Sequence, residues 1–133
     1  MMNSVRGYIF SRSFMGERVP QHVQNLVVRD YCERNSLHFL LSAAEYAMPG
    51  CHLVLEQALG KLAEVSGLVF YSLFQLPEEN SRRQSIYEQI LSQQKDLHFA
   101  VEGLRANTQK EFERIEILWR TRLTLPQCAK IDV

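Results

Sequence analysis

The chain has 133 residues, with 15 Lys and Arg against 15 Asp and Glu, so its formal net charge is +0. This balance argues against proteins that bind nucleic acid by electrostatic attraction and against polybasic membrane-surface proteins, because both need an excess of cations. With 46% hydrophobic residues the chain can bury one core, and no apolar run approaches the ~20 residues of a membrane helix. No apolar signal segment opens the chain. We therefore expect a single cytoplasmic domain over residues 1–133 that binds neither nucleic acid nor membrane, with a core over about 5–123 and a tail over 124–133.

The three cysteines, Cys32, Cys51 and Cys128, are widely spaced and form no CxxC pair. No Cys and His residues have the spacing of a zinc site. We expect reduced thiols, no metal and no cofactor.

The first half of the chain alternates short apolar runs with amphipathic ones. A β-branched and aromatic run predicts a strand over residues 5–11. Pro20 then suits the first turn of a helix that continues to about Asn35, and its apolar residues recur at i, i+3 and i+4. The run over 37–42 predicts a second strand.

The second half repeats this alternation. A helix over about 55–65 ends at Ser66-Gly67, and the nearly all-apolar run 68–73 is typical of a strand buried on both faces. A helix over 81–93 and a strand over 97–102 follow. The last helix opens with a capping box at Thr108 and Glu111, and its apolar residues Phe112, Ile115, Leu118, Trp119 and Ile117 lie on more than one face. This excess predicts a homo-oligomer, with Trp119 as the best marker of the interface.

This βαβαβαβα pattern predicts a three-layer α/β fold of the flavodoxin-like kind. Its four-stranded, mainly parallel sheet has the order 2-1-3-4, with helices on both faces.

Ligands of such sheets bind beyond the carboxyl ends of the strands, where the strand order reverses. Polar residues follow all four predicted strands, and we expect them at one rim. Glu45, Glu102 and Ser11 are the candidate catalytic residues, since two nearby carboxylates suit proton transfer. Arg12, Arg18, Ser72 and Gln75 are the candidate substrate-binding residues. The competing interpretation is that these residues only begin loops, as polar residues do in every α/β protein.

Standard motifs are missing from the sequence. It has no GxGxxG, no GxxxxGK[ST] and no GxSxG. His38 and His98 hold equivalent places in two predicted strands and are interpreted as structural.

Three long blocks resemble the sporadic carbohydrate cluster family, small proteins encoded in bacterial surface-polysaccharide and O-antigen loci. The blocks are Gly7-Tyr8-Ile9-Phe10-Ser11-Arg12 with 20–26, Leu40-Leu41-Ser42-Ala43-Ala44-Glu45-Tyr46, and Tyr71-Ser72-Leu73-Phe74-Gln75-Leu76-Pro77. The resemblance implies a role in making a surface glycan and supplies no catalytic residue.

More distantly, the chain resembles the catalytic domain of serine recombinases, the resolvases and invertases. Gly7-Tyr8 and Ser11 or Ser13 are similar to their opening Gly-Tyr-x-Arg-Val-Ser, and 70–76 to a later strand that runs into Asp-Arg-Leu-x-Arg. Phe10 stands where an arginine is expected, and 74–78 lacks both later arginines. Recombination needs such cations to stabilise the transferring phosphodiester, so the resemblance implies the fold and the place of the site, but not the activity.

Together these observations favour a protein of surface-carbohydrate biosynthesis that binds a sugar phosphate or nucleotide sugar. Acid–base chemistry on that ligand (isomerisation, epimerisation, dehydration or hydrolysis) fits best. A non-catalytic accessory subunit of a biosynthetic enzyme is the alternative, and a degenerate recombinase-like DNA binder is the least favoured. Neither Arg12 nor Glu45 is expected in the core.

Overall fold

The computed structural model describes residues 3–124, so most of the predicted tail, with Cys128, lies outside the described residues. Its sheet has five strands: β1 (Ser4–Phe10), β2 (His38–Glu45), β3 (Gly67–Phe70), β4 (Asp96–Phe99) and β5 (Leu104–Ala106). Their order is β2-β1-β3-β4-β5. The first four strands are parallel to their neighbours, and β5 is antiparallel to β4.

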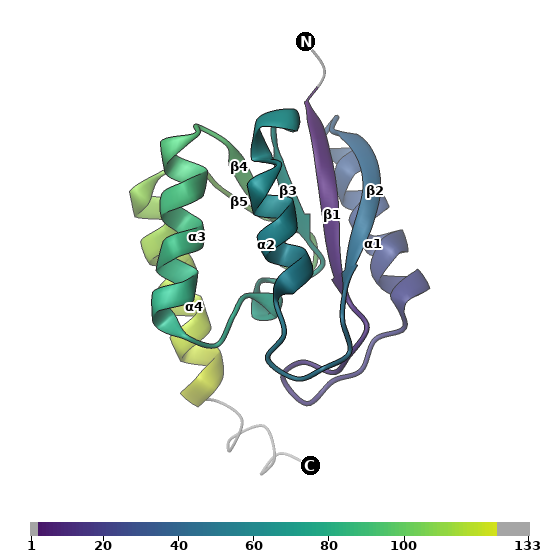
Figure 1. Ribbon diagram of the computed structural model, residues 1–133, viewed down its shortest axis with the longest axis vertical. Coiled ribbons are helices and arrows are strands. Elements are labelled where there is room, and N and C mark those ends of the chain that lie inside the picture. Colours follow the sequence, from purple (N-terminus) through teal and green to yellow (C-terminus); the bar gives the residue numbers. More distant parts are fainter. Residues whose placement is uncertain (1–2, 125–133) are drawn as a thin grey trace.

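Four α-helices join or follow these strands: α1 (Gln21–Arg34), α2 (Leu53–Gly60), α3 (Asn80–Ser92) and α4 (Gln109–Thr124) (Figure 1). Side chains of α1 pack with Val5, Ile9 and Val69 on one face of the sheet. A larger core on the other face joins Tyr8, Phe70 and their neighbours to α2, α3 and α4. Helices therefore cover both faces, as the alternating pattern predicts.

The predicted order of the first four strands is confirmed, but the four-stranded parallel sheet is incomplete. The missed strand β5 has only three residues, one of them an exposed arginine, which is too short for an alternating pattern to show. The third strand also ends at Phe70, earlier than predicted. Beyond it, Leu73–Gln75 forms a 3-10 turn, and the Ser72 hydroxyl caps this turn by accepting from the Phe74 N–H at 3.2 Å.

Two glycines allow the close approaches on which the sheet depends. A Cβ atom at Gly7 would lie 2.3 Å from Ser42 Oγ on β2, and one at Gly67 would lie 2.2 Å from the carbonyl oxygen of Asp96 on β4. Both distances are far below van der Waals contact. A side chain at Gly67 would therefore displace the main chain of β4, and one at Gly7 would displace the Ser42 side chain.

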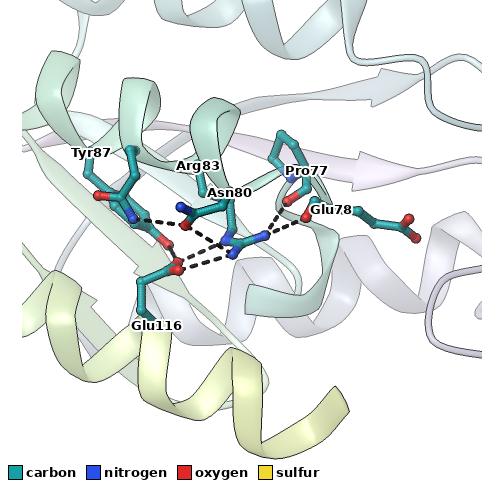
Figure 2. Close-up of polar contacts among 7 residues, drawn as sticks. Pro77, Glu78, Asn80, Arg83, Tyr87 and Glu116 are labelled. Carbon is teal, nitrogen blue, oxygen red and sulfur yellow. Dashed lines mark hydrogen bonds and ion pairs between the residues drawn. The ribbon is translucent and has the colours of Figure 1, made fainter.

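A buried ion pair fastens α3 to α4. Arg83 donates from Nε to Glu116 at 2.8 Å and from Nη2 to the other carboxylate oxygen at 3.0 Å, and Tyr87 donates its hydroxyl to Glu116 at 2.6 Å (Figure 2). Nη1 of Arg83 donates to the carbonyl oxygens of Pro77 and Glu78. This one guanidinium therefore fixes the segment that leads from the sheet into α3.

Trp119 packs inside the same region, where its ring stacks on that of Phe74. The Arg83 guanidinium lies over the Trp119 ring, 4.6 Å from the ring centroid. Trp119 is only 2% exposed, so its interpretation as an interface marker is wrong. Ile117 on the outer face of α4 is 61% exposed, and the predicted homo-oligomer stays a prediction. Among the described residues no helix is both long and apolar enough to cross a membrane.

We predict that Glu116→Gln destabilises the fold by about 3–5 kcal/mol, because it leaves the Arg83 charge buried without its carboxylate. Urea unfolding measures this loss, with Glu113→Gln, an exposed change on the same helix, as the control. Equal stability of the two variants would contradict a structural role for the pair.

Candidate functional site

A pocket of about 620 Å³ opens at the carboxyl edge of the sheet, near the predicted reversal of strand order. The loop after β1, the loop after β2 and the segment from η2 (Leu73–Gln75) into α3 form its walls. Its polar lining consists of Ser11, Arg12, Ser13, Arg18, His52, Glu78, Glu79 and Arg82. We call it the rim pocket.

Arg12 is held in place within the rim pocket by uncharged groups. Its Nη1 donates to the carbonyl oxygen of Tyr46 at 2.8 Å, and its guanidinium lies 4.2 Å from the centroid of the Phe10 ring. Among the described residues no carboxylate oxygen lies within 4 Å of it. Arg12 is therefore positioned by the protein while its charge remains available to an anion.

The other charges of the rim pocket favour an anion only modestly. Arg18 and Arg82 are exposed and, within residues 3–124, form no ion pair, whereas Glu78 and Glu79 bring two carboxylates to the rim. Burial, together with the charge of Arg12, lowers the pKa of His52 below its ordinary value, so this imidazole is neutral at neutral pH. Three guanidinium groups thus face two carboxylates.

Glu45 lies at the end of β2 but does not line the rim pocket. Its carboxylate accepts from the Tyr8 hydroxyl at 2.8 Å and from the N–H groups of Val54 and Leu55, both at 3.1 Å, at the start of α2. Burial alone would raise the pKa of this carboxyl, but these hydrogen bonds, with one from the Tyr46 N–H, hold it below its ordinary value. Glu45 is 1% exposed, so the expectation that it lies outside the core is wrong.

Ser11 lies between these two features. It lines the rim pocket, yet its hydroxyl donates to the backbone carbonyl of Glu45. Ser13, two residues further along the same loop, is exposed and also lines the pocket.

Gln75 belongs to a buried amide network. Its Nε2 donates to Gln24 Oε1 at 2.9 Å, and the Gln24 amide exchanges two hydrogen bonds of 2.9 Å with the main chain of Phe10. Both glutamine side chains are 0% exposed. The network ties the end of β1 to α1 and η2, behind the rim pocket.

Ser72 and Glu102 form a third, separate group. The Ser72 hydroxyl donates to one Glu102 carboxylate oxygen at 2.8 Å, and the Leu73 N–H donates to the other at 3.0 Å. The loops after β3 and β4 are joined in this way. Of the seven predicted site residues, the structure therefore gathers Ser11, Arg12 and Arg18 in the rim pocket and places the other four outside its lining.

Sequence reasoning missed His52, Glu78, Glu79 and Arg82 in this pocket. His52 directly precedes α2, and Arg82 lies in the first turn of α3. Helices that follow parallel strands begin at the carboxyl edge of the sheet, so residues at the predicted helix starts could have been expected at this pocket. In the part of the chain that the structure describes, no three His, Cys, Asp or Glu side chains could together hold a metal ion.

The fold is similar to two solved recombinase structures. The N-terminal catalytic domain of TP901-1 integrase matches with a TM-score of 0.57 at 11% identity, over 92% of this chain and 98% of that one. A resolvase family site-specific recombinase from Streptococcus pneumoniae matches with a TM-score of 0.64 at 8% identity, over 96% of this chain and 94% of that one. No family model and no curated protein matches. At such low identity these likenesses establish the fold.

The comparisons correct three expectations. They contradict the predicted role in surface-carbohydrate biosynthesis, with its alternative of an accessory subunit, because the structural neighbours are recombinase domains and nothing supports the carbohydrate cluster family. They contradict the sugar phosphate or nucleotide sugar as partner. They also contradict the expectation that the chain binds no nucleic acid. That expectation relied on the net charge of the chain and not on the positions of its arginines.

We predict that Glu45→Gln lowers the free energy of unfolding by about 1–3 kcal/mol at neutral pH, since it removes a charged acceptor from the start of α2. Because the folded protein holds the pKa of Glu45 below 4.5, its contribution is complete above that pH and is lost as the pH falls through the lowered value.

Urea titrations between neutral pH and about pH 3 test this prediction. The wild type should lose stability more steeply on acidification than Glu45→Gln. Glu88→Gln, an exposed change within α3, should behave as the wild type does. Parallel pH profiles for the wild type and Glu45→Gln would refute the assignment.

Proposed function

We propose that this chain is a nucleic-acid-binding protein and that its rim pocket holds a phosphate of the backbone. The observation that carries the proposal is Arg12, a guanidinium fixed at the carboxyl edge by Phe10 and the Tyr46 carbonyl. The fold that presents it is similar, over nearly the whole chain, to an integrase catalytic domain and a site-specific recombinase. Recombination takes place at phosphodiesters, and Arg12 gives this chain a positioned cation for one at the carboxyl edge of its sheet.

The chemistry of the rim pocket suits a phosphodiester. A guanidinium can donate two parallel hydrogen bonds to phosphate oxygens, and hydrogen bonds between charged groups are about twice as strong as neutral ones. Arg12 provides such a fork, and Arg18 and Arg82 add charge at the rim. The exposed Ser13 hydroxyl is a further donor from the Arg12 loop.

The same geometry favours binding without strand cleavage. In the segment after β3, Gln75 is buried in the amide network, and Glu78 adds a negative charge to the pocket lining. The Ser11 hydroxyl is committed to the Glu45 carbonyl. A transferring phosphodiester would meet fewer cations here than the serine recombinase motif supplies, so we propose that the chain docks on nucleic acid rather than cutting it.

We predict that Arg12→Ala weakens binding to a fluorescently labelled DNA duplex by about 1.5–3 kcal/mol, the scale of a lost charged hydrogen bond. Fluorescence anisotropy measures the affinity. Because up to three arginines meet phosphates, log affinity against log salt should fall with a slope of about −2.7 for the wild type and about −1.8 for the variant.

Arg114→Ala is the matched control, since Arg114 is exposed on α4 and does not line the rim pocket. It should bind DNA as the wild type does. If Arg12→Ala and Arg114→Ala weakened DNA binding equally, the affinity would come from general electrostatic attraction and not from the rim pocket. Nicking of supercoiled plasmid by the wild type would contradict docking without cleavage.

A further inference from the structure

A second pocket, of about 500 Å³, lies between α1 and β2 and shares no residue with the rim pocket. It is lined by His22, Asn25, Leu26 and Arg29 of α1 and by Phe39, Leu41 and Ser42 of β2. We call it the α1–β2 pocket.

Two polar atoms of this pocket's lining residues have unmet hydrogen-bonding capacity. Asn25 Oδ1 and Ser42 Oγ are buried and have no hydrogen-bond partner among the described residues. An unsatisfied buried polar atom costs folding free energy, and nearly all such atoms in native proteins are satisfied. Both atoms have almost no accessible surface, and a Cβ atom at Gly7 of β1 would lie 2.3 Å from Ser42 Oγ, so a docked group does not reach them.

The pocket also exposes apolar surface beside an open sheet edge. Leu26 is 63% exposed and Leu41 is 75% exposed. Among the described residues β2 pairs only with β1, so it is an outer strand whose other edge has main-chain N–H and C=O groups free to bind. Between the pairs Val5–Phe39 and Gly7–Ser42 the register shifts by one residue, and Leu41 lies within this bulge.

The charge around the pocket is positive. Arg29 is exposed, and among the described residues no Asp or Glu lines the pocket. The Arg29 guanidinium lies 5.4 Å from the centroid of the Phe39 ring and forms no ion pair with the described residues. The neighbouring carboxylate of Asp30 pairs with Arg34 instead.

We propose that the α1–β2 pocket docks an extended segment of a partner protein that carries an apolar side chain beside an acidic one. The apolar side chain would cover Leu26 and Leu41, and the carboxylate would pair with Arg29. The main chain of the segment would pair with the free edge of β2. Nucleic acid fits less well, because its phosphates would engage Arg29 but leave both leucines without apolar contact.

The probes are peptides selected from a random phage-display library for binding to the whole chain. The enriched peptides should share an apolar residue close to Asp or Glu. Each is then synthesised with a fluorophore, and its affinity is measured for the wild type and for Leu41→Asn, Arg29→Ala and Ser42→Ala. Ile117→Asn, an equally apolar and exposed position on α4, is the matched control.

We expect Leu41→Asn and Arg29→Ala each to weaken peptide binding by about tenfold or more, while Ser42→Ala, Ile117→Asn and Arg12→Ala leave it unchanged. Ser42→Ala should also raise the melting temperature of the free protein, because it removes an unsatisfied buried hydroxyl.

Failure to enrich any peptide, or full affinity of the peptides for Leu41→Asn, would overturn this inference. Loss of DNA binding in Leu41→Asn and Arg29→Ala, with peptide binding unchanged, would assign the pocket to nucleic acid instead. Since Arg12→Ala tests the rim pocket alone, failure of the proposed function and failure of this inference can be told apart.

Discussion

The Glu45 carboxylate joins three elements that are separate in the sequence, namely β1, β2 and α2. It ends β2, accepts the Tyr8 hydroxyl from β1 and accepts two N–H groups at the start of α2. Helix N-termini carry unpaired N–H groups and a partial positive charge, so a buried carboxylate there satisfies both the helix and itself. Without it, β1 and β2 would lose their polar link to α2.

The rim pocket depends on the same turn of the chain. The carbonyl of Glu45 accepts the Ser11 hydroxyl, and the next carbonyl, that of Tyr46, accepts Arg12 Nη1. On the opposite side, the Gln24–Gln75 amides hold the end of β1 through Phe10, whose ring lies beneath Arg12. The available guanidinium is thus positioned by two networks whose buried members Glu45, Gln24 and Gln75 do not line the rim pocket.

The order of the first four strands could be predicted from the sequence, because apolar runs alternate with amphipathic ones and right-handed crossovers leave few topologies. The sequence also placed Arg12 and Arg18 at the carboxyl edge of the sheet, where the structure has them. It could not separate Glu45 from that site, because a carboxylate after a strand looks the same whether it faces a ligand or a helix N-terminus. Arg83 was missed as well, although it shares the inward face of α3 with Ile86, Tyr87 and Ile90; its partner Glu116 is 33 residues away. Long-range polar pairs leave no local pattern.

The central claim is that a nucleic-acid phosphate binds among Arg12, Arg18 and Arg82. An NMR titration of the ¹⁵N-labelled chain with a short DNA duplex tests it most directly, by following the arginine Nε–H signals and the backbone amides. The account predicts that the Nε–H signals of these three arginines and the amides of residues 11–18 shift together and saturate, while those of Arg105 and Arg114 do not move. Shifts confined to other arginines, or no shifts at a DNA concentration where anisotropy shows binding, would contradict it.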